Sequence, residues 1–96
     1  MAEKNLEKQV SRGERARQLL ENSVLPEAFA AIKEVYTKAL VEAPIRDIEG
    51  IQKLKIMIGL VDKLKETLET FVNDGKVAVK ELSWLQKKAG KMLKVL

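Results

Sequence analysis

The sequence predicts an all-α protein with an antiparallel helical hairpin at its centre, flanking N- and C-terminal helices, and coiled-coil-like packing. Apolar residues recur at helical spacing along most of the chain, and the longest such pattern runs from Ile48 to Asp74. The two prolines, Pro26 and Pro44, stand near the ends of helical patterns, where proline is tolerated. No stretch has the alternation of apolar and polar residues that is typical of a half-buried strand.

The length of the chain predicts one helical domain spanning residues 1–96. Charged residues make up 33% of the sequence and hydrophobic residues 46%, a balance that is ordinary for helical bundles and too apolar for disorder. A chain this short buries a small share of its unfolded surface, so an isolated helical monomer is expected to be marginally stable.

The first helix is expected over about residues 3–22, where Leu6, Val10, Gly13, Ala16 and Leu20 recur at spacings of three and four. This apolar stripe is thin, and a glycine inside it lowers the helix propensity. The segment Asn22–Pro26 then predicts a break, because Asn and Ser suit helix ends.

The second helix is expected over about residues 26–42, since Pro26 fits a first helical turn and Pro44 disfavours the α conformation at the residue before it. The third is expected over about residues 47–74, with Asp47 as its N-cap and Gly75 as the C′ residue that ends it. Asp74-Gly75-Lys76 is then either a tight turn or a local kink before a basic C-terminal helix over about residues 76–95. The short loop between the second and third helices predicts an antiparallel hairpin.

Gly59 lies inside the third helical pattern, where a glycine costs about 1 kcal/mol relative to alanine. Two explanations stay open, namely the close approach of another backbone or simple tolerance of the glycine.

The last two helical patterns each carry a heptad seam of apolar residues. Further apolar residues widen the first seam beyond what two helices can cover, and together the seams exceed what one short chain can bury. We therefore expect a homo-oligomer, although Trp84 could equally cover a helix of its own subunit. The predicted interface residues are Leu54, Met57, Val61, Leu64, Leu68, Phe71, Leu82, Trp84, Leu85 and Met92.

Residue chemistry argues against an enzyme and predicts no metal site and no cofactor. The sequence contains neither cysteine nor histidine, its glycines are isolated, and its serines have no base beside them. The carboxylates Asp62, Glu66 and Glu69 share a helical face with flanking lysines, and we expect this face to be exposed to solvent. No apolar run is long enough to span a membrane, so the chain is expected to be intracellular and soluble.

The net charge of +4 is concentrated at the C-terminus, where residues 76–96 hold six lysines and one glutamate. These lysines could neutralise phosphates in a weak, sequence-independent contact with duplex DNA, or they could only solvate a packed seam. Attachment to a membrane surface is a further option that the seam pattern favours less. The candidate nucleic-acid contacts are Arg12, Arg15, Arg17, Lys80, Lys87, Lys88, Lys91 and Lys94.

Two parts of the sequence resemble small helical proteins of tailed bacteriophages and prophages. One is Leu19-Leu20-Glu21-Asn22 with Leu25-Pro26-Glu27-Ala28-Phe29, and the other is Arg46-Asp47-Ile48-Glu49-Gly50 with Lys53-Leu54 and, later, Asp74-Gly75-Lys76-Val77-Ala78. The resemblance covers about residues 12–80 and extends to the oligomeric core of a small terminase subunit, which brings viral DNA to the packaging motor. Lys55 departs from the pattern, because an aromatic residue is usual there, and we expect no separate DNA-binding head before the core.

The resemblance implies an oligomeric phage assembly or DNA-packaging factor in the cytoplasm of a bacterial host, in contact with duplex DNA or with another packaging or assembly protein. The alternative is a helical protein–protein adaptor or scaffold that binds no nucleic acid.

Overall fold

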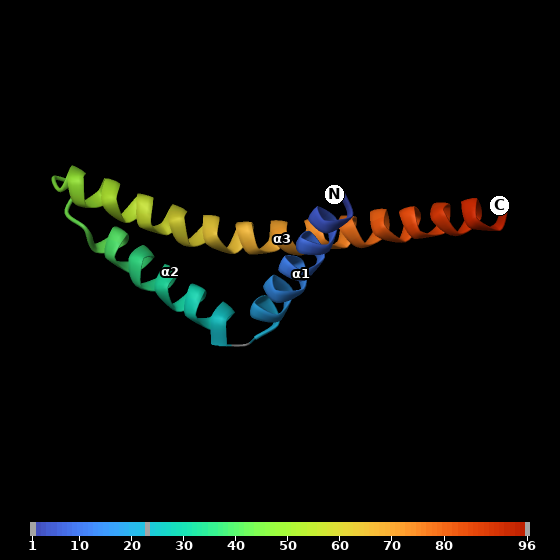
Figure 1. Ribbon diagram of the computed structural model, residues 1–96. Coiled ribbons are helices and arrows are strands. Elements are labelled where there is room, and N and C mark those ends of the chain that lie inside the picture. The colour runs from blue at the N-terminus through green and yellow to red at the C-terminus, as the bar shows by residue number, and fades with distance from the viewer. Residues whose placement is uncertain (1, 23, 96) are drawn as a thin grey trace. The chain divides into compact units, whose positions relative to one another are not determined.

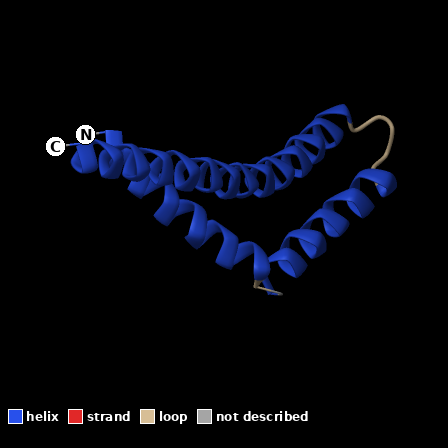
Figure 2. Cartoon of the chain, turned by 90° about the vertical axis from the view of Figure 1, so that its right-hand side faces the viewer, coloured by secondary structure: helices blue, strands red, loops and turns tan. Residues whose placement is uncertain are grey.

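The computed structural model describes residues 2–22 and 24–95, with side chains described for residues 3–22 and 24–90. The described chain is all-helical: α1 spans Ala2–Glu21, α2 spans Val24–Glu42 and α3 spans Ile48–Val95 (Figure 1). In this part of the chain, loops occur only between helices and no strand is present (Figure 2). The predicted all-α class is therefore confirmed.

Contacts between residues divide the chain into two compact units. Unit 1 combines Met1–Gln18 with Leu68–Leu96, so it pairs most of α1 with the C-terminal part of α3. Unit 2 is the continuous segment Leu19–Thr67, which contains α2, the loop after it and the N-terminal part of α3. The prediction of one domain over residues 1–96 stays a prediction.

The helix ends in unit 2 follow from local sequence. The Asn22 side-chain oxygen accepts a hydrogen bond from the Val24 amide, 3.0 Å away, at the start of α2. Asp47 is the N-cap of α3, as predicted, because its Oδ1 accepts a hydrogen bond of 3.0 Å from the Gly50 amide. The Ile51 amide donates to the Asp47 carbonyl at 3.0 Å, which closes the first helical turn.

The predicted helix end at Gly75 was wrong. Helix α3 continues from Ile48 to Val95 as one element of 48 residues, so there is neither a turn nor a separate helix over 76–95. No described glycine has a positive φ, and Gly75 is therefore not in the left-handed conformation of a C′ residue.

The role of Gly75 is to let α1 approach α3 closely in unit 1. A Cβ atom on Gly75 would lie 3.0 Å from the Gly13 Cα and 3.2 Å from the Gln9 carbonyl oxygen, and a Cβ on Gly13 would lie 2.7 Å from the Phe71 carbonyl oxygen. Ala16 and Ala78, each three residues further along its helix, are 3% and 1% exposed. Small residues at this spacing on both helices bring the two backbones together at the crossing.

Among the described side chains, the four buried residues are these two glycines and two alanines, and all four belong to unit 1. Unit 2 contains no buried residue in its described part; Leu54, Met57 and Val61 of α3 are only partly buried there. The finer prediction of a hairpin with coiled-coil-like packing stays a prediction.

Candidate association surfaces

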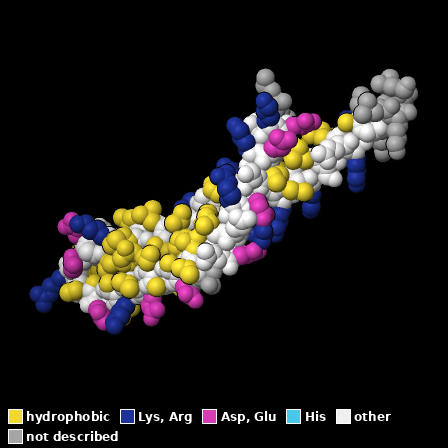
Figure 3. Space-filling view, turned by 60° about the horizontal axis from the view of Figure 1, so that its bottom comes forward, with side chains coloured by type: hydrophobic (Ala, Val, Ile, Leu, Met, Phe, Trp, Pro, Cys, Tyr) yellow, Lys and Arg dark blue, Asp and Glu magenta, His cyan; other side chains and the backbone are white. Residues whose placement is uncertain are grey.

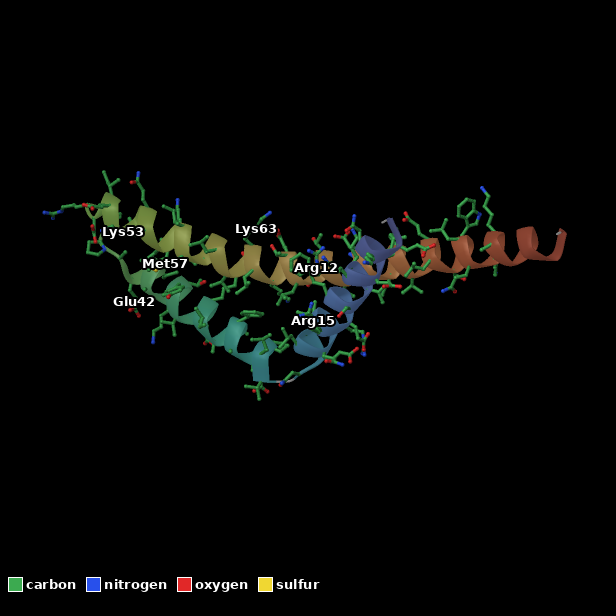
Figure 4. All side chains as sticks on the ribbon, viewed as in Figure 1. Arg12, Arg15, Glu42, Lys53, Met57 and Lys63 are labelled. Carbon is green, nitrogen blue, oxygen red and sulfur yellow. The ribbon has the colours of Figure 1, made fainter. Side chains whose placement is uncertain are left out.

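The predicted seam of α3 is only partly covered within unit 2. Met57 lies on the side of α3 that faces α2, whereas Lys63 projects away from α2 (Figure 4). A shallow hollow between the two helices is lined by Pro26, Phe29 and Ala30 from α2 and by Val61, Asp62 and Lys65 from α3. Lys33 closes one side of the hollow with an ion pair of 2.9 Å between its Nζ and the Asp62 Oδ1.

The remaining predicted interface residues fall into different environments. Leu64, in unit 2, is 52% exposed, and Trp84, in unit 1, is 59% exposed. Leu68, Phe71, Leu82 and Leu85 are partly buried in unit 1, and the side chain of Met92 lies outside the described residues. No member of the predicted interface with a described side chain is fully buried, so each retains surface that a partner could cover.

Large exposed apolar side chains are concentrated in unit 2 (Figure 3). Ten of the thirteen such residues found among the described side chains belong to it, and three belong to unit 1. In unit 2 they are Leu19, Val24, Ile32, Val35, Val41, Ile45, Ile48, Ile56, Leu60 and Leu64, and in unit 1 Val77, Val79 and Trp84.

The predicted interface omitted Ile56 and Leu60, which are 62% and 63% exposed. With Leu64 they recur at intervals of four residues, so they form a second apolar stripe on α3, which meets the seam that contains Met57 at Leu64. The spacing was visible in the sequence. It was overlooked because the heptad pattern of Leu54, Met57 and Val61 accounted for the apolar content of the helix on its own.

Each of the three arginines of α1 that were predicted to contact nucleic acid makes an interaction within its own unit. The guanidinium carbon of Arg12 lies 4.1 Å from the centroid of the Phe71 ring, and its Nη2 is 3.9 Å from Asp74 Oδ2. Arg15 donates a hydrogen bond of 3.4 Å to the Ser11 carbonyl oxygen. The contact between Arg12 and Phe71 ties α1 to α3 in unit 1.

Arg17 forms an ion pair with Glu14, one helical turn before it. The hydrogen bond from Arg17 is the main reason why the pKa of the Glu14 carboxyl is below its ordinary value of 4.5; slight desolvation opposes this shift, and the positive charge of Arg17 adds to it. Arg15, which is exposed on the same helix (Figure 4), has no such acidic partner among the described contacts.

The lysines of the C-terminal part of α3 form a basic face around Trp84. Lys80, Lys87 and Lys88 are exposed and stand four residues before, three after and four after the tryptophan, which places them on its side of the helix. The Nζ of Lys88 lies 5.0 Å from the centroid of the Trp84 ring, within cation–π distance. The side chains of the other two predicted contacts, Lys91 and Lys94, lie outside the described residues.

No group of three or more acidic side chains that could hold a metal ion occurs within the described part of the chain. None of its helices combines the length and apolar character needed to cross a membrane.

A scan of protein-family models, a search of curated proteins and a search of solved structures found no match to this chain.

Proposed function

We propose that this protein is a non-enzymatic assembly factor that works as a homo-oligomer. The observation that supports this most directly is the state of unit 2, which has no buried residue among its described side chains and exposes ten large apolar ones. This many exposed large apolar side chains favour association, because leaving them in water costs roughly 25 cal/mol per Å² of apolar area.

In this proposal α2 and the first part of α3 form an antiparallel hairpin that completes its core only against other subunits. The partly buried ridge of Leu54, Met57 and Val61 provides the intramolecular half of the packing. Coiled-coil-like contacts with other copies then cover what the hairpin leaves exposed.

Sedimentation equilibrium of the full chain at micromolar concentration tests this proposal. We expect a discrete oligomer with a helical circular-dichroism spectrum that is lost cooperatively on heating. A monomer with the same helical content across the concentration range would overturn the proposal.

The narrower role that we propose is phage assembly or DNA packaging, with a non-specific contact to duplex DNA. The support for a phage role is the sequence resemblance described above, and the support for the DNA contact is the basic face around Trp84. Phosphate contacts made by lysines release counterions, so binding would weaken steeply with salt.

Electrophoretic shift of duplex DNA at several salt concentrations tests the narrower role. The variant Lys80→Gln/Lys87→Gln/Lys88→Gln should lose the shift, because it removes the cations of the basic face. A matched control changes Lys53, Lys55 and Lys65, which are exposed on unit 2, and it should bind as well as the original chain.

A protein–protein adaptor or scaffold without nucleic-acid binding is the alternative function. It shares the association surface of unit 2 and differs only in the role of the lysines, which would solvate the helix. No shift of DNA at low salt, together with an intact oligomer, would favour the adaptor.

A further inference from the structure

Ile56, Leu60 and Leu64 form an exposed apolar stripe along α3. These three side chains are 62%, 63% and 52% exposed, they recur every four residues, and all three belong to unit 2. Met57 is partly buried and lies on the side of α3 that faces α2 (Figure 4), whereas Ile56 and Leu60 lie roughly 100° and 60° around the helix from it.

Opposite charges lie before and after Ile56 and Leu60 along α3. Glu49, whose side chain is 80% exposed, lies one residue after the helix start, and the exposed Lys63 lies fourteen residues further on. Fourteen residues correspond to nearly four turns, so the two side chains lie on the same face of α3, roughly 21 Å apart along its axis. Ile56 is seven residues from each of them.

We propose that this face of α3 binds the same face of a second copy of the chain, with the two helices antiparallel and the two-fold axis near Ile56. This inference rests on the proposed self-association and specifies one of its surfaces. In the antiparallel arrangement Glu49 of each copy lies opposite Lys63 of the other, which gives two equivalent ion pairs. Ile56 meets its own symmetry mate at the axis, and each Leu60 covers the flank of that contact.

The charge pattern also selects the direction of the two helices. A parallel arrangement in register would place Glu49 against Glu49 and Lys63 against Lys63, and like charges in contact disfavour a complex. The face is therefore complementary to itself only when one helix is reversed.

A charge-swap series in the full chain tests this surface by sedimentation equilibrium at low salt. Glu49→Lys and Lys63→Glu should each weaken self-association by about tenfold, because each single change sets like charges opposite each other at both ends of the interface. The double variant should return to within about threefold of the original, since it restores both opposite-charge pairs. Glu49→Lys also breaks the 3.3 Å ion pair with Lys53 within the helix, but the double variant shares that loss, so its recovery excludes a purely local cause.

Two further variants complete the design. Lys55→Glu reverses an exposed charge next to Ile56 but about 100° around the helix, and it should leave the association constant unchanged. Ile56→Arg places two cations at the proposed axis and should give a helical monomer or a smaller oligomer, with the helical content of each variant confirmed by circular dichroism.

The outcomes distinguish a failure of self-association from a failure of this particular surface. If the original chain is monomeric, the proposed self-association fails, and this surface fails with it. If the original chain is oligomeric but both single charge variants assemble as well as it does, only this antiparallel surface is overturned.

Discussion

Unit 1 and unit 2 are both helical, but they differ in which side chains they bury. Unit 1 brings two backbones together through Gly13 and Gly75 and buries Ala16 and Ala78 beside them. Unit 2 has larger apolar side chains and buries none of them in its described part. Small residues allow a close intramolecular crossing, whereas the large residues of unit 2 leave apolar surface that the chain itself does not cover.

The largest change in the free energy of unfolding is expected when a side chain is added at the helix crossing in unit 1. In Gly13→Ala the new Cβ would lie 2.7 Å from the Phe71 carbonyl oxygen and 2.9 Å from the Gly75 Cα. These are backbone atoms that cannot rotate away, so the helices must separate. We expect a net loss of about 2 kcal/mol in the free energy of unfolding, with the overpacking penalty exceeding the gain in helix propensity.

Urea unfolding followed by circular dichroism measures this loss. Gly90→Ala is the matched control, because a Cβ at Gly90 would meet nothing within 4 Å. An unchanged midpoint for Gly13→Ala would mean that the crossing does not contribute to stability.

The next largest loss of stability is expected when the N-cap of α3 in unit 2 is removed. Asp47→Ala removes the acceptor of the Gly50 amide, and we expect it to lower the free energy of unfolding by about 1 kcal/mol. Asp47→Asn keeps a side-chain oxygen at the same place and should recover most of the loss. Thermal unfolding of the three proteins makes the comparison, and equal losses for both variants would exclude the capping hydrogen bond as the cause.

A gain in stability is expected when Gly59 is replaced by alanine. Within the chain a Cβ there would meet nothing within 4 Å, in contrast with Gly13 and Gly75, so the two explanations considered from the sequence can now be separated. We expect Gly59→Ala to raise the free energy of unfolding by up to about 1 kcal/mol, through helix propensity alone. A loss that grows with protein concentration would instead show that a backbone of another subunit approaches this glycine.

The sequence predicted those features that depend on neighbouring residues. The N-cap at Asp47 and the end of α2 before Pro44 follow from local hydrogen bonding and backbone restriction, and both are observed. Gly75 was misinterpreted because a glycine after Asn73-Asp74 suits a helix end as well as a helix crossing. Only its non-local neighbour, Gly13, distinguishes the two roles.

The candidate surface was predicted less completely than the helices. The heptad spacing identified the partly buried side of α3 that carries Met57 but not the exposed stripe of Ile56 and Leu60. A helix with apolar residues on two sides gives no sign, in its own sequence, of which side its chain will cover. That choice depends on where α2 packs, which is a property of the tertiary structure.

The smallest expected effect is a pH dependence of stability that arises from Glu14 in unit 1. The pKa of Glu14 is lowered in the folded protein by its hydrogen bond with Arg17, so its contribution to stability is fully present above the ordinary carboxyl value of 4.5 and is lost as the pH falls through the folded pKa. Glu14→Gln removes this contribution and should be slightly less stable than the original chain at pH 7. The difference should shrink between pH 7 and pH 2.5, because protonation of Glu14 weakens its interaction with Arg17.

The control for this pH dependence is Glu7→Gln, which removes an exposed carboxylate from the same helix without touching Arg17. It changes the net charge by the same amount as Glu14→Gln, so general charge effects are matched between the two variants. If the difference between Glu14→Gln and Glu7→Gln is the same at pH 7 and pH 2.5, the ion pair with Arg17 does not contribute to the free energy of unfolding.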